Sequence, residues 1–339
     1  MLELVMQPLA EWRDDARVEE ICINGLGVVH VRRGGVFASF DVAMDYDDLY
    51  DIAILAGALR KQDIGERRPL LSCDFAGGRL QSVLPPCVPH GTVSHTIRRL
   101  GTFVAPLSAV PGRYNTERWN MWTRRREAQA ASMAHVLAVY DTGDLPAFLA
   151  AIVAARFNIL LCGGTGSGKT SMSRTLTALI DPAERVLTIE DALELVVPQP
   201  NHVRLLYSKG DLSGANIGPM QLLEATLRMR PDRVLLQELR DPEAAYVYIN
   251  EVMTGHPGSI TTIHGRNAAQ AMARLFTLVK GSPEGRSYDD ATLLHMISHA
   301  VDVVIPFETA GTTYSIREVW LAADAARRGE RFHDLMQDV

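Results

Sequence analysis

The first third of the chain carries short runs in which apolar and polar residues alternate. Such alternation, with a period of two, predicts strands that bury one face. Glycine and proline separate the runs, which fall at residues 20–24, 28–32, 79–84 and 93–98. Between them, residues 47–59 place apolar side chains at helical spacing, with Asp45 or Asp47 as the candidate N-cap. We therefore expect residues 1–110 to form an N-terminal α+β domain with an antiparallel sheet.

A different pattern follows in the second half of the chain. Short apolar runs alternate with segments of helical spacing, and the runs fall at residues 158–162, 186–189, 234–237, 260–263 and 301–305. This alternation predicts a mainly parallel sheet that is covered by helices on both faces. We expect an α/β domain over residues 147–339. A linker over residues 111–146, with a polar helix around residues 116–140, joins it to the first domain.

Composition narrows the class of protein. Hydrophobic residues make up 47% and charged residues 22% of the 339 positions, which suits a globular chain with a sizeable core. No apolar run approaches the ~18 residues of a spanning helix, and residues 1–17 lack the features of a signal peptide. We therefore expect a cytoplasmic protein. The net charge of −6 provides no global basic field, so no sequence-specific binding of nucleic acid is expected.

The four cysteines are widely spaced and form no CxxC pair. This spacing argues against a zinc ribbon and against a disulfide framework, and it is typical of a reducing compartment.

A complete G-x-x-x-x-G-K-[ST] motif follows the apolar run at residues 158–162. Glycines in such a loop let successive N–H groups point at phosphate oxygens, and the helix that follows adds its N-terminus. The lysine supplies a point charge for the β- and γ-phosphates, and the last hydroxyl is a ligand for Mg²⁺. The sequence therefore predicts a site for ATP and Mg²⁺ formed by Gly163, Gly164, Thr165, Gly166, Ser167, Gly168, Lys169, Thr170 and Ser171.

Acidic residues follow two later strands. Glu190, with Asp191 and Glu194 close behind, ends the run at residues 186–189, and Glu238 ends the next. The carboxyl ends of parallel strands form the crevice in which nucleotides bind. Hydrolysis needs a carboxylate near the metal and a group that orients water, so both positions are candidates for these roles.

Histidines and arginines surround the same strands. His256 and His264 flank the run at residues 260–263, but no well-spaced third ligand supports a metal site there. From the residues alone, His264 is equally explained as a hydrogen-bonded histidine at a strand end. Arginine is suited to multidentate phosphate contacts or to pairing with a neighbouring subunit, and four arginines are placed for this: Arg228, Arg230, Arg233 and Arg240.

Taken together, the motifs resemble those of the secretion-ATPase superfamily, whose members drive type II and type IV secretion and pilus assembly. The Walker A loop, Asp box, Walker B region and His box of that family correspond to GGTGSGKT (163–170), VLTIEDALEL (186–195), LRMRPDRVLLQELRD (227–241) and TGHPGSITTIHG (254–265). The N-terminal domain of the type IV secretion and conjugal-transfer ATPases resembles residues 20–35 and 78–100. Their C-terminal strands resemble residues 302–308 and 314–320.

The resemblance implies a RecA-like P-loop ATPase domain and a role for each matching residue. Lys169 and Thr170 would hold phosphate and Mg²⁺. Glu190 would be the catalytic carboxylate, and Glu238 would position Mg²⁺ or water. The remaining assignments are His264 as the reader of the γ-phosphate, Arg240 beside Glu238, and Arg79 and Arg98 as arginines of the N-terminal domain that reach the nucleotide.

The family also implies a ring-shaped homohexamer, peripheral to the inner membrane, that works with other secretion-system components. The chain departs from the pattern at Gln237, where the family usually has a small residue, and at Arg99–Gly101, where many relatives have a basic residue, proline and serine.

Several functions share these motifs. The leading hypothesis is an ATP-hydrolysing motor of a type IV secretion system. The same chemistry serves type II secretion, pilus and tight-adherence machines, although the absence of CxxC pairs disfavours the zinc-bearing branch. A nucleotide-gated scaffold without turnover and a P-loop kinase of small molecules are the alternatives from other classes.

Overall fold

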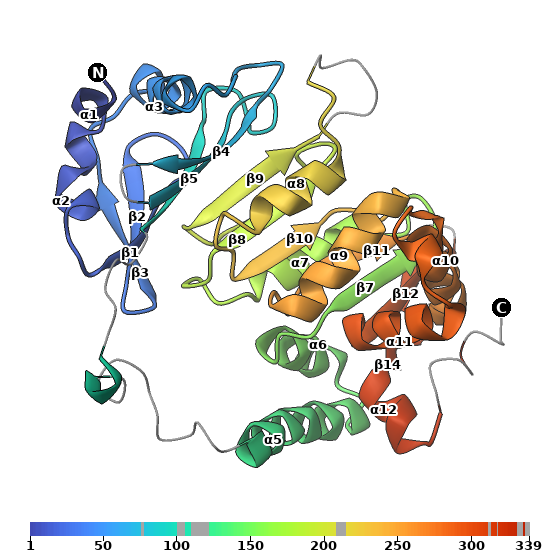
Figure 1. The fold of residues 1–339 in the computed structure, drawn as a ribbon. Coiled ribbons are helices and arrows are strands. Elements are labelled where there is room, and N and C mark those ends of the chain that lie inside the picture. Colours follow the sequence, from blue (N-terminus) through green and yellow to red (C-terminus); the bar gives the residue numbers. More distant parts are fainter. Residues whose placement is uncertain are drawn as a thin grey trace.

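The computed structural model describes residues 1–75, 78–99, 106–109, 122–207, 215–310, 313–316, 318–330 and 335. Figure 1 shows an N-terminal domain, in blue, lying beside a larger domain built on a twisted sheet. The sheets confirm the predicted fold class. The domain boundaries at residues 110 and 146 stay predictions, and residues 110–121 lie outside the described part of the chain.

A six-stranded antiparallel sheet forms the N-terminal domain, in the order β3-β2-β1-β6-β5-β4. Helix α3 (Tyr46–Leu59) begins with Asp45 as its N-cap, in a reciprocal capping box with Asp48. It packs over the sheet around a core that includes Ile21, Leu49 and Leu80. The strands are β1 (Val18–Ile23), β2 (Val28–Arg33), β3 (Val36–Asp41), β4 (Leu70–Phe75), β5 (Gly78–Val83) and β6 (Ser94–Arg99). Before them lie the short helices α1 (Leu2–Val5), η1 (Gln7–Leu9) and α2 (Ala10–Arg13).

The C-terminal domain contains an eight-stranded sheet in the order β13-β12-β7-β11-β10-β8-β9, with β14 beside β12. The strands from β12 to β9 run parallel, and β13 and β14 are antiparallel to β12. The strands are β7 (Ile159–Gly163), β8 (Val186–Glu190), β9 (His202–Leu206), β10 (Arg233–Leu236), β11 (Ile260–Ile263), β12 (Val303–Ala310), β13 (Thr313–Ile316) and β14 (Trp320–Leu321).

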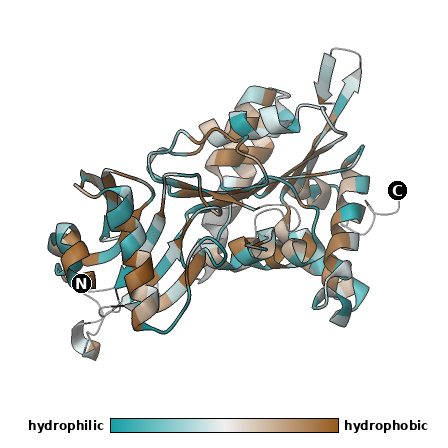
Figure 2. Ribbon diagram, turned by 90° about the horizontal axis from the view of Figure 1, so that it is seen from above, coloured by the Kyte–Doolittle hydropathy of each residue, from teal (hydrophilic) through white to brown (hydrophobic). Residues whose placement is uncertain are grey.

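Helices cover both faces of this sheet, so two hydrophobic clusters lie on either side of it. Along β7, Leu160 and Cys162 belong to one cluster, and Ile159 and Leu161 belong to the other. Burial on both faces explains why these strands are continuous apolar runs rather than alternating ones. Figure 2 shows the hydrophobic residues concentrated along these strands. The helices are α5 (Trp122–Asp141), α6 (Leu145–Ala154), α7 (Lys169–Ala178), α8 (Pro219–Thr226), α9 (Pro242–Thr254), α10 (Ala268–Gly281), α11 (Asp290–Ala300) and α12 (Ala322–Arg327). The short 3-10 turns are η2 (Leu107–Ala109) and η4 (Gly285–Ser287).

The two domains are joined by apolar contacts along the edge strand β9. Val83 and Cys87 of the N-terminal domain lie in the same buried cluster as Leu205 and Tyr207. The amide of Leu206 donates a hydrogen bond of 2.9 Å to the carbonyl oxygen of Cys87. The N-terminal domain therefore covers one edge of the parallel sheet (Figure 1).

A buried arginine reinforces this interface. Arg185, which immediately precedes β8, is 0% exposed. Its Nη1 donates to Asn24 Oδ1 at 2.8 Å, and it also contacts Asn201. Its Nε donates to the carbonyl oxygen of Met229 at 2.9 Å. One guanidinium thus bonds to both domains. Among the described residues, no helix has both the length and the apolar composition needed to cross a bilayer.

Candidate functional site

The glycine-rich loop connects the centre of the sheet to helix α7. Strand β7 ends at Gly163, and α7 begins at Lys169. A Cβ at Gly163 would lie 2.7 Å from the carbonyl oxygen of Phe307, so only glycine lets β7 approach β12 here. Gly168 adopts a φ of +94°, a conformation that side chains disfavour. The two glycines therefore permit the turn that points backbone amides and the N-terminus of α7 into one cavity.

Lys169 lies at the mouth of this loop. Its Nζ donates to the carbonyl oxygens of Gly163 at 2.8 Å and Gly164 at 2.7 Å. Burial lowers the pKa of Lys169, and the nearby carboxylate of Glu238 acts in the opposite direction. A partly buried ammonium at the N-terminus of a helix is suited to binding an anion.

A cavity of about 490 Å³ opens over the loop, a volume within the usual range for small-molecule sites. It is lined by Thr165, Gly166, Ser167, Gly168, Lys169, Thr170, Ser171, Asp191, Glu194, Gln237, Glu238, Arg240, Thr262, His264 and Tyr314. The structure thus brings most of the predicted phosphate-binding residues together with three of the four predicted catalytic residues. Gly163 and Gly164 are not among the lining residues, although both belong to the loop.

Glu238 is the centre of a charged network on the far side of the cavity. Its Oε2 accepts a hydrogen bond from Arg240 Nη2, and its Oε1 lies 3.0 Å from His264 Nε2. Arg240 Nη1 in turn lies 3.3 Å from Asp191 Oδ2. The hydrogen bond to Glu238 is the main cause of the raised pKa of Arg240. The strands β8, β10 and β11 thus end at one cavity, which is lined by two acidic side chains, Asp191 and Glu238, and two basic ones, Arg240 and His264.

Glu190 lies outside this network. It is 0% exposed, and its Oε2 accepts hydrogen bonds from the amides of Glu194 and Leu195, each at 2.8 Å. Thr188 Oγ1 donates to its Oε1 at 2.7 Å, and Arg204 approaches both oxygens at 3.2 Å. In this arrangement the carboxylate holds the loop after β8 rather than facing the cavity. The catalytic role assigned to Glu190 stays a prediction.

Gln237 stands where the family usually has a small residue, and its side chain makes two hydrogen bonds to the loop after β8. Its Oε1 accepts from the amide of Asp191 at 2.9 Å, and its Nε2 donates to Glu194 Oε2 at 3.0 Å. The side chain thus connects the end of β10 to the acidic loop after β8. The sequence identified the unusual residue but not this contact, which depends on β8 and β10 being neighbours.

Arg79 and Arg98 lie apart from the cavity. They are cross-strand partners on β5 and β6, and both are about two-thirds exposed. Arg79 Nε lies 3.6 Å from Asp74 Oδ1, and Arg98 Nε lies 3.8 Å from Glu20 Oε1. Neither lines the cavity, so their contact with nucleotide also stays a prediction.

Two side chains in the cavity, those of Thr170 and Glu238, carry the oxygen groups that bind Mg²⁺. Magnesium takes oxygen ligands, usually a carboxylate or a hydroxyl together with water and substrate phosphates. Thr170 and Glu238 supply these groups to the same cavity. Glu238 Oε1 is buried and accepts no well-aligned hydrogen bond among the described residues, despite its nearness to His264. The described part of the chain has no cluster of three or more His, Cys, Asp or Glu side chains that could hold a metal.

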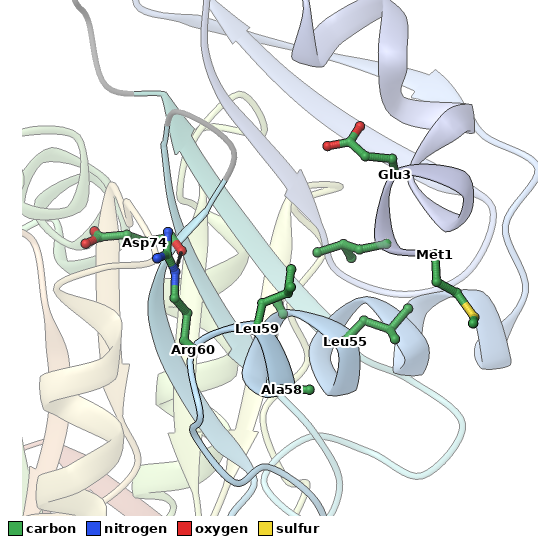
Figure 3. A pocket seen from close by; sticks show the side chains of 9 residues that line it. Met1, Glu3, Leu55, Ala58, Leu59, Arg60 and Asp74 are labelled. Carbon is green, nitrogen blue, oxygen red and sulfur yellow. Dashed lines mark hydrogen bonds between the residues drawn. The ribbon is translucent and has the colours of Figure 1, made fainter.

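A second cavity, of about 690 Å³, lies in the N-terminal domain between α1 and α3 (Figure 3). Its lining is mainly apolar and includes Met1, Leu55 and Leu59. Arg60 is turned toward Asp74, where its Nε donates to the backbone oxygen at 2.8 Å. This cavity lacks the convergent polar groups of the first, which remains the candidate site.

The glycine-rich loop between a central parallel strand and a helix, opposed by acids on neighbouring strands, defines a P-loop nucleotide-binding domain. Comparison with known proteins specifies the family. The family described as "Type II/IV secretion system protein" matches residues 106–308. VirB11 of Rhizobium radiobacter is 53% identical over 336 residues, which cover 99% of this chain and 98% of that protein. VirB11 of Bartonella quintana is 36% identical over 325 residues, 93% of this chain and 91% of that protein.

A solved structure agrees with these relatives. The VirB11 ATPase of the Brucella suis type IV secretion system, crystallised in complex with sulphate, superposes with a TM-score of 0.87. It is 32% identical in sequence, and the match covers 96% of each chain. The chain therefore belongs to the Type II/IV secretion system protein family and, within it, to the VirB11 ATPases of type IV secretion.

Proposed function

We propose that this protein is a Mg²⁺-dependent, ATP-hydrolysing motor that energises assembly of a type IV secretion system and transfer of substrate through it. One observation carries the proposal: a single cavity is bordered by the phosphate loop on one side and by the Glu238–Arg240–His264 network on the other. Phosphoryl transfer needs such an arrangement, because its catalysis is mainly positioning and charge stabilisation.

The residues take the following roles in this proposal. The loop amides and Lys169 bind the β- and γ-phosphates. Thr170 and Glu238 would hold Mg²⁺, which neutralises charge on the transferred phosphoryl group when bound. Arg240 fixes one oxygen of Glu238, so that the other stays directed toward His264 and the cavity. His264 is then placed to respond to the γ-phosphate. The family assignment supports Glu190 as the catalytic carboxylate, which requires that the loop after β8 release it.

The motor would act as a homohexamer at the cytoplasmic face of the inner membrane, together with other components of the secretion system. The resemblance of the sequence motifs to the secretion-ATPase superfamily supports this proposal. Arg79 and Arg98 lie side by side on one sheet, so a movement of the N-terminal domain would bring both to a nucleotide together. Domain closure on a ligand that both halves contact is a common way to convert binding into movement.

Phosphate release by the full chain, with and without Mg²⁺, tests the hydrolytic function. Lys169→Ala should lower turnover roughly a hundredfold or more, because it removes a charge that stabilises the transition state. Lys61→Ala, at an exposed lysine of the N-terminal domain, is the matched control and should turn over normally. Full activity in Lys169→Ala would refute the assignment. Binding of ATP without turnover by the wild type would favour a nucleotide-gated scaffold. Light scattering with Mg-ATP tests the hexamer.

A further inference from the structure

The nucleotide-binding and catalytic roles proposed for the cavity leave one aromatic side chain without a function. Tyr314, on β13, lines the cavity with the phosphate loop and is 63% exposed. Its ring lies against the backbone of Gly168, since a Cβ there would meet three ring atoms at 3.3–3.8 Å. Among the described residues that line the cavity, it supplies the one phenyl-type ring. An exposed aromatic face therefore lies directly beside the start of helix α7.

The order of strands places this ring on the side of the loop away from the acids. The phosphate loop follows β7, and the sheet runs β13-β12-β7-β11-β10-β8. The charged network follows β8, β10 and β11, all on one side of β7, and Tyr314 is two strands away on the other side. A triphosphate whose γ-phosphate faces Glu238 would therefore direct its nucleoside toward β13.

The register of β12 with β7 and β13 also places the ring of Tyr314 level with the phosphate loop, beyond the carboxyl end of β7. Phe307 of β12 pairs with Gly163, the last residue of β7. Thr309, two residues further along β12, pairs with Tyr314. At ~3.3 Å per residue, Tyr314 stands about 7 Å beyond the carboxyl edge of β7. The loop residues that follow Gly163 occupy the same level.

The side chains that line the cavity differ in the part of a nucleotide that each can contact. Apart from Tyr314, the cavity is lined by glycine backbone, hydroxyls, charged groups, the amide of Gln237 and the imidazole of His264. The amide bonds to Asp191 and Glu194, and the imidazole lies 3.0 Å from Glu238 on the side of the acids, so neither offers an apolar face beside the start of α7. The base is the flat apolar part of a nucleotide, and aromatic side chains stack on bases of any identity. We infer that the ring of Tyr314 is the surface on which the base of the bound nucleotide stacks. It is therefore the residue through which the site prefers a nucleoside triphosphate to bare triphosphate.

This inference rests on the proposed nucleotide site, so the test must distinguish stacking of the base on Tyr314 from binding of the phosphates by the loop. Calorimetry on the full chain with Mg²⁺ would measure binding of three probes: the β,γ-imido analogues of ATP and of GTP, and inorganic tripolyphosphate. Tyr314→Ala should weaken both analogues between about fivefold and about a hundredfold, the usual effect of losing one stacking ring. Tripolyphosphate should bind as before. Tyr314→Phe keeps the ring and should bind all three probes like the wild type.

Two further variants serve as controls. Tyr288→Ala removes a tyrosine that is 36% exposed and lies 6.4 Å, centroid to centroid, from Tyr246, away from the cavity; it should change nothing. Lys169→Ala should weaken all three probes, and if it weakens none, the proposed phosphate site itself is wrong. If Tyr314→Ala does not fold, Tyr314→Leu removes the π face while keeping most of the bulk.

Two results would overturn the inference while leaving the phosphate site intact. One is wild-type affinity of Tyr314→Ala for both nucleotide analogues. The other is an equal loss of affinity for tripolyphosphate, which would make Tyr314 a support for the shape of the loop rather than a contact of the base.

Discussion

Glu190 and Glu238 end neighbouring strands, yet they have different surroundings. Glu238 faces the cavity, where its Oε1 accepts no well-aligned hydrogen bond among the described residues. Glu190 is enclosed by two loop amides, Thr188 and Arg204. Both acids could be predicted from their positions after apolar strands. Their difference could not, because Arg204 lies on β9, a strand that the pattern did not predict.

The enclosure of Glu190 leads to a prediction at this residue. Glu190→Gln should lower the free energy of unfolding by about 2–4 kcal/mol, because it leaves Arg204 without its charged partner and gives the loop amides a weaker acceptor. Turnover should fall in parallel. Urea denaturation and steady-state kinetics measure the two effects. Glu11→Gln, at an exposed position of α2, should leave stability unchanged. Because the proposed function also makes Glu190 a catalytic group, a loss of kcat at wild-type stability would contradict only its role in holding the loop.

Tyr314 shows another limit of prediction at this scale. The motif identifies the residues that bind phosphate, because their spacing along the chain is fixed by one loop. Tyr314 comes 146 positions after Gly168 in the printed sequence and reaches it only through the pairing of β12 with β7 and with β13. No local pattern marks such a contact. A residue that recognises the base is therefore harder to predict than the residues that recognise the phosphates.

At the scale of elements, the strands that the pattern did not predict lie at the edges of the sheets. Strands β3 and β4 border the N-terminal sheet, and β9 and β13 border the other sheet, where β14 pairs with β12 alone. An edge strand pairs on one side and accepts polar residues such as His202 and Arg204, which weaken the apolar signal. The central strands and helix α3 were predicted to within a few residues. The structure also shows that α5 spans Trp122–Asp141, close to the helix expected around residues 116–140.

A buried carboxyl group between α8 and α9 contributes to the dependence of stability on pH. Thr226 Oγ1 lies 2.6 Å from the carbonyl oxygen of Leu223 and 2.7 Å from Glu251 Oε1. The hydroxyl of Thr226 donates to the carboxylate, and this hydrogen bond lowers the pKa of Glu251, but burial has the larger effect. Burial raises the pKa of Glu251 from 4.5 to about 7. The folded protein therefore holds this proton more tightly than the unfolded chain does.

Because Glu251 binds its proton more tightly in the folded state, proton linkage sets the direction in which stability changes with pH. Between pH 4.5 and about 7 the folded state binds more protons than the unfolded state, so stability falls as pH rises through this window. Glu251→Gln should remove this loss and be more stable than the wild type by about 3 kcal/mol at pH 8. His30 and His95, whose pKa values burial lowers to about 4, act in the opposite direction. The difference between variant and wild type is thus the quantity to measure.

Urea denaturation at pH 5 and pH 8 provides that difference. Glu243→Gln, at an exposed position of the same helix, is the control and should show the pH dependence of the wild type. An equal shift of stability at both pH values in Glu251→Gln would contradict the assignment.

At the scale of the whole molecule, the interface between the domains depends on residues that the sequence does not link. Asn24 and Arg185 are 161 positions apart and belong to different domains. The motifs were sufficient to predict the fold class and the family, because they are local and occur in a characteristic order. The contact between the domains could not be predicted, since it joins one loop of the first sheet to the start of a strand in the second.

Asn24 provides a test of this interface. Its Oδ1 accepts from Arg185, and its Nδ2 donates to Asn201 Oδ1 at 2.9 Å. Asn24→Ala removes both bonds and should weaken docking of the domains by about 1–3 kcal/mol, since one bond involves a charged donor. Small-angle scattering should then give a larger radius of gyration, and proteolysis between the domains should be faster. Gln7→Ala, exposed on η1, should change neither. An unchanged radius and cleavage rate in Asn24→Ala would show that the apolar contacts alone hold the interface.

The position of Cys87 gives the protein a natural reporter of domain movement. Its side chain is 2% exposed within the cluster shared by the two domains, and burial raises the pKa of the thiol to about 12. The other three cysteines are buried as well. Because only an accessible thiolate reacts with electrophiles, the closed protein should be almost inert toward thiol reagents. Each parting of the domains would uncover Cys87, so the rate of its alkylation would record how often the two halves separate during turnover.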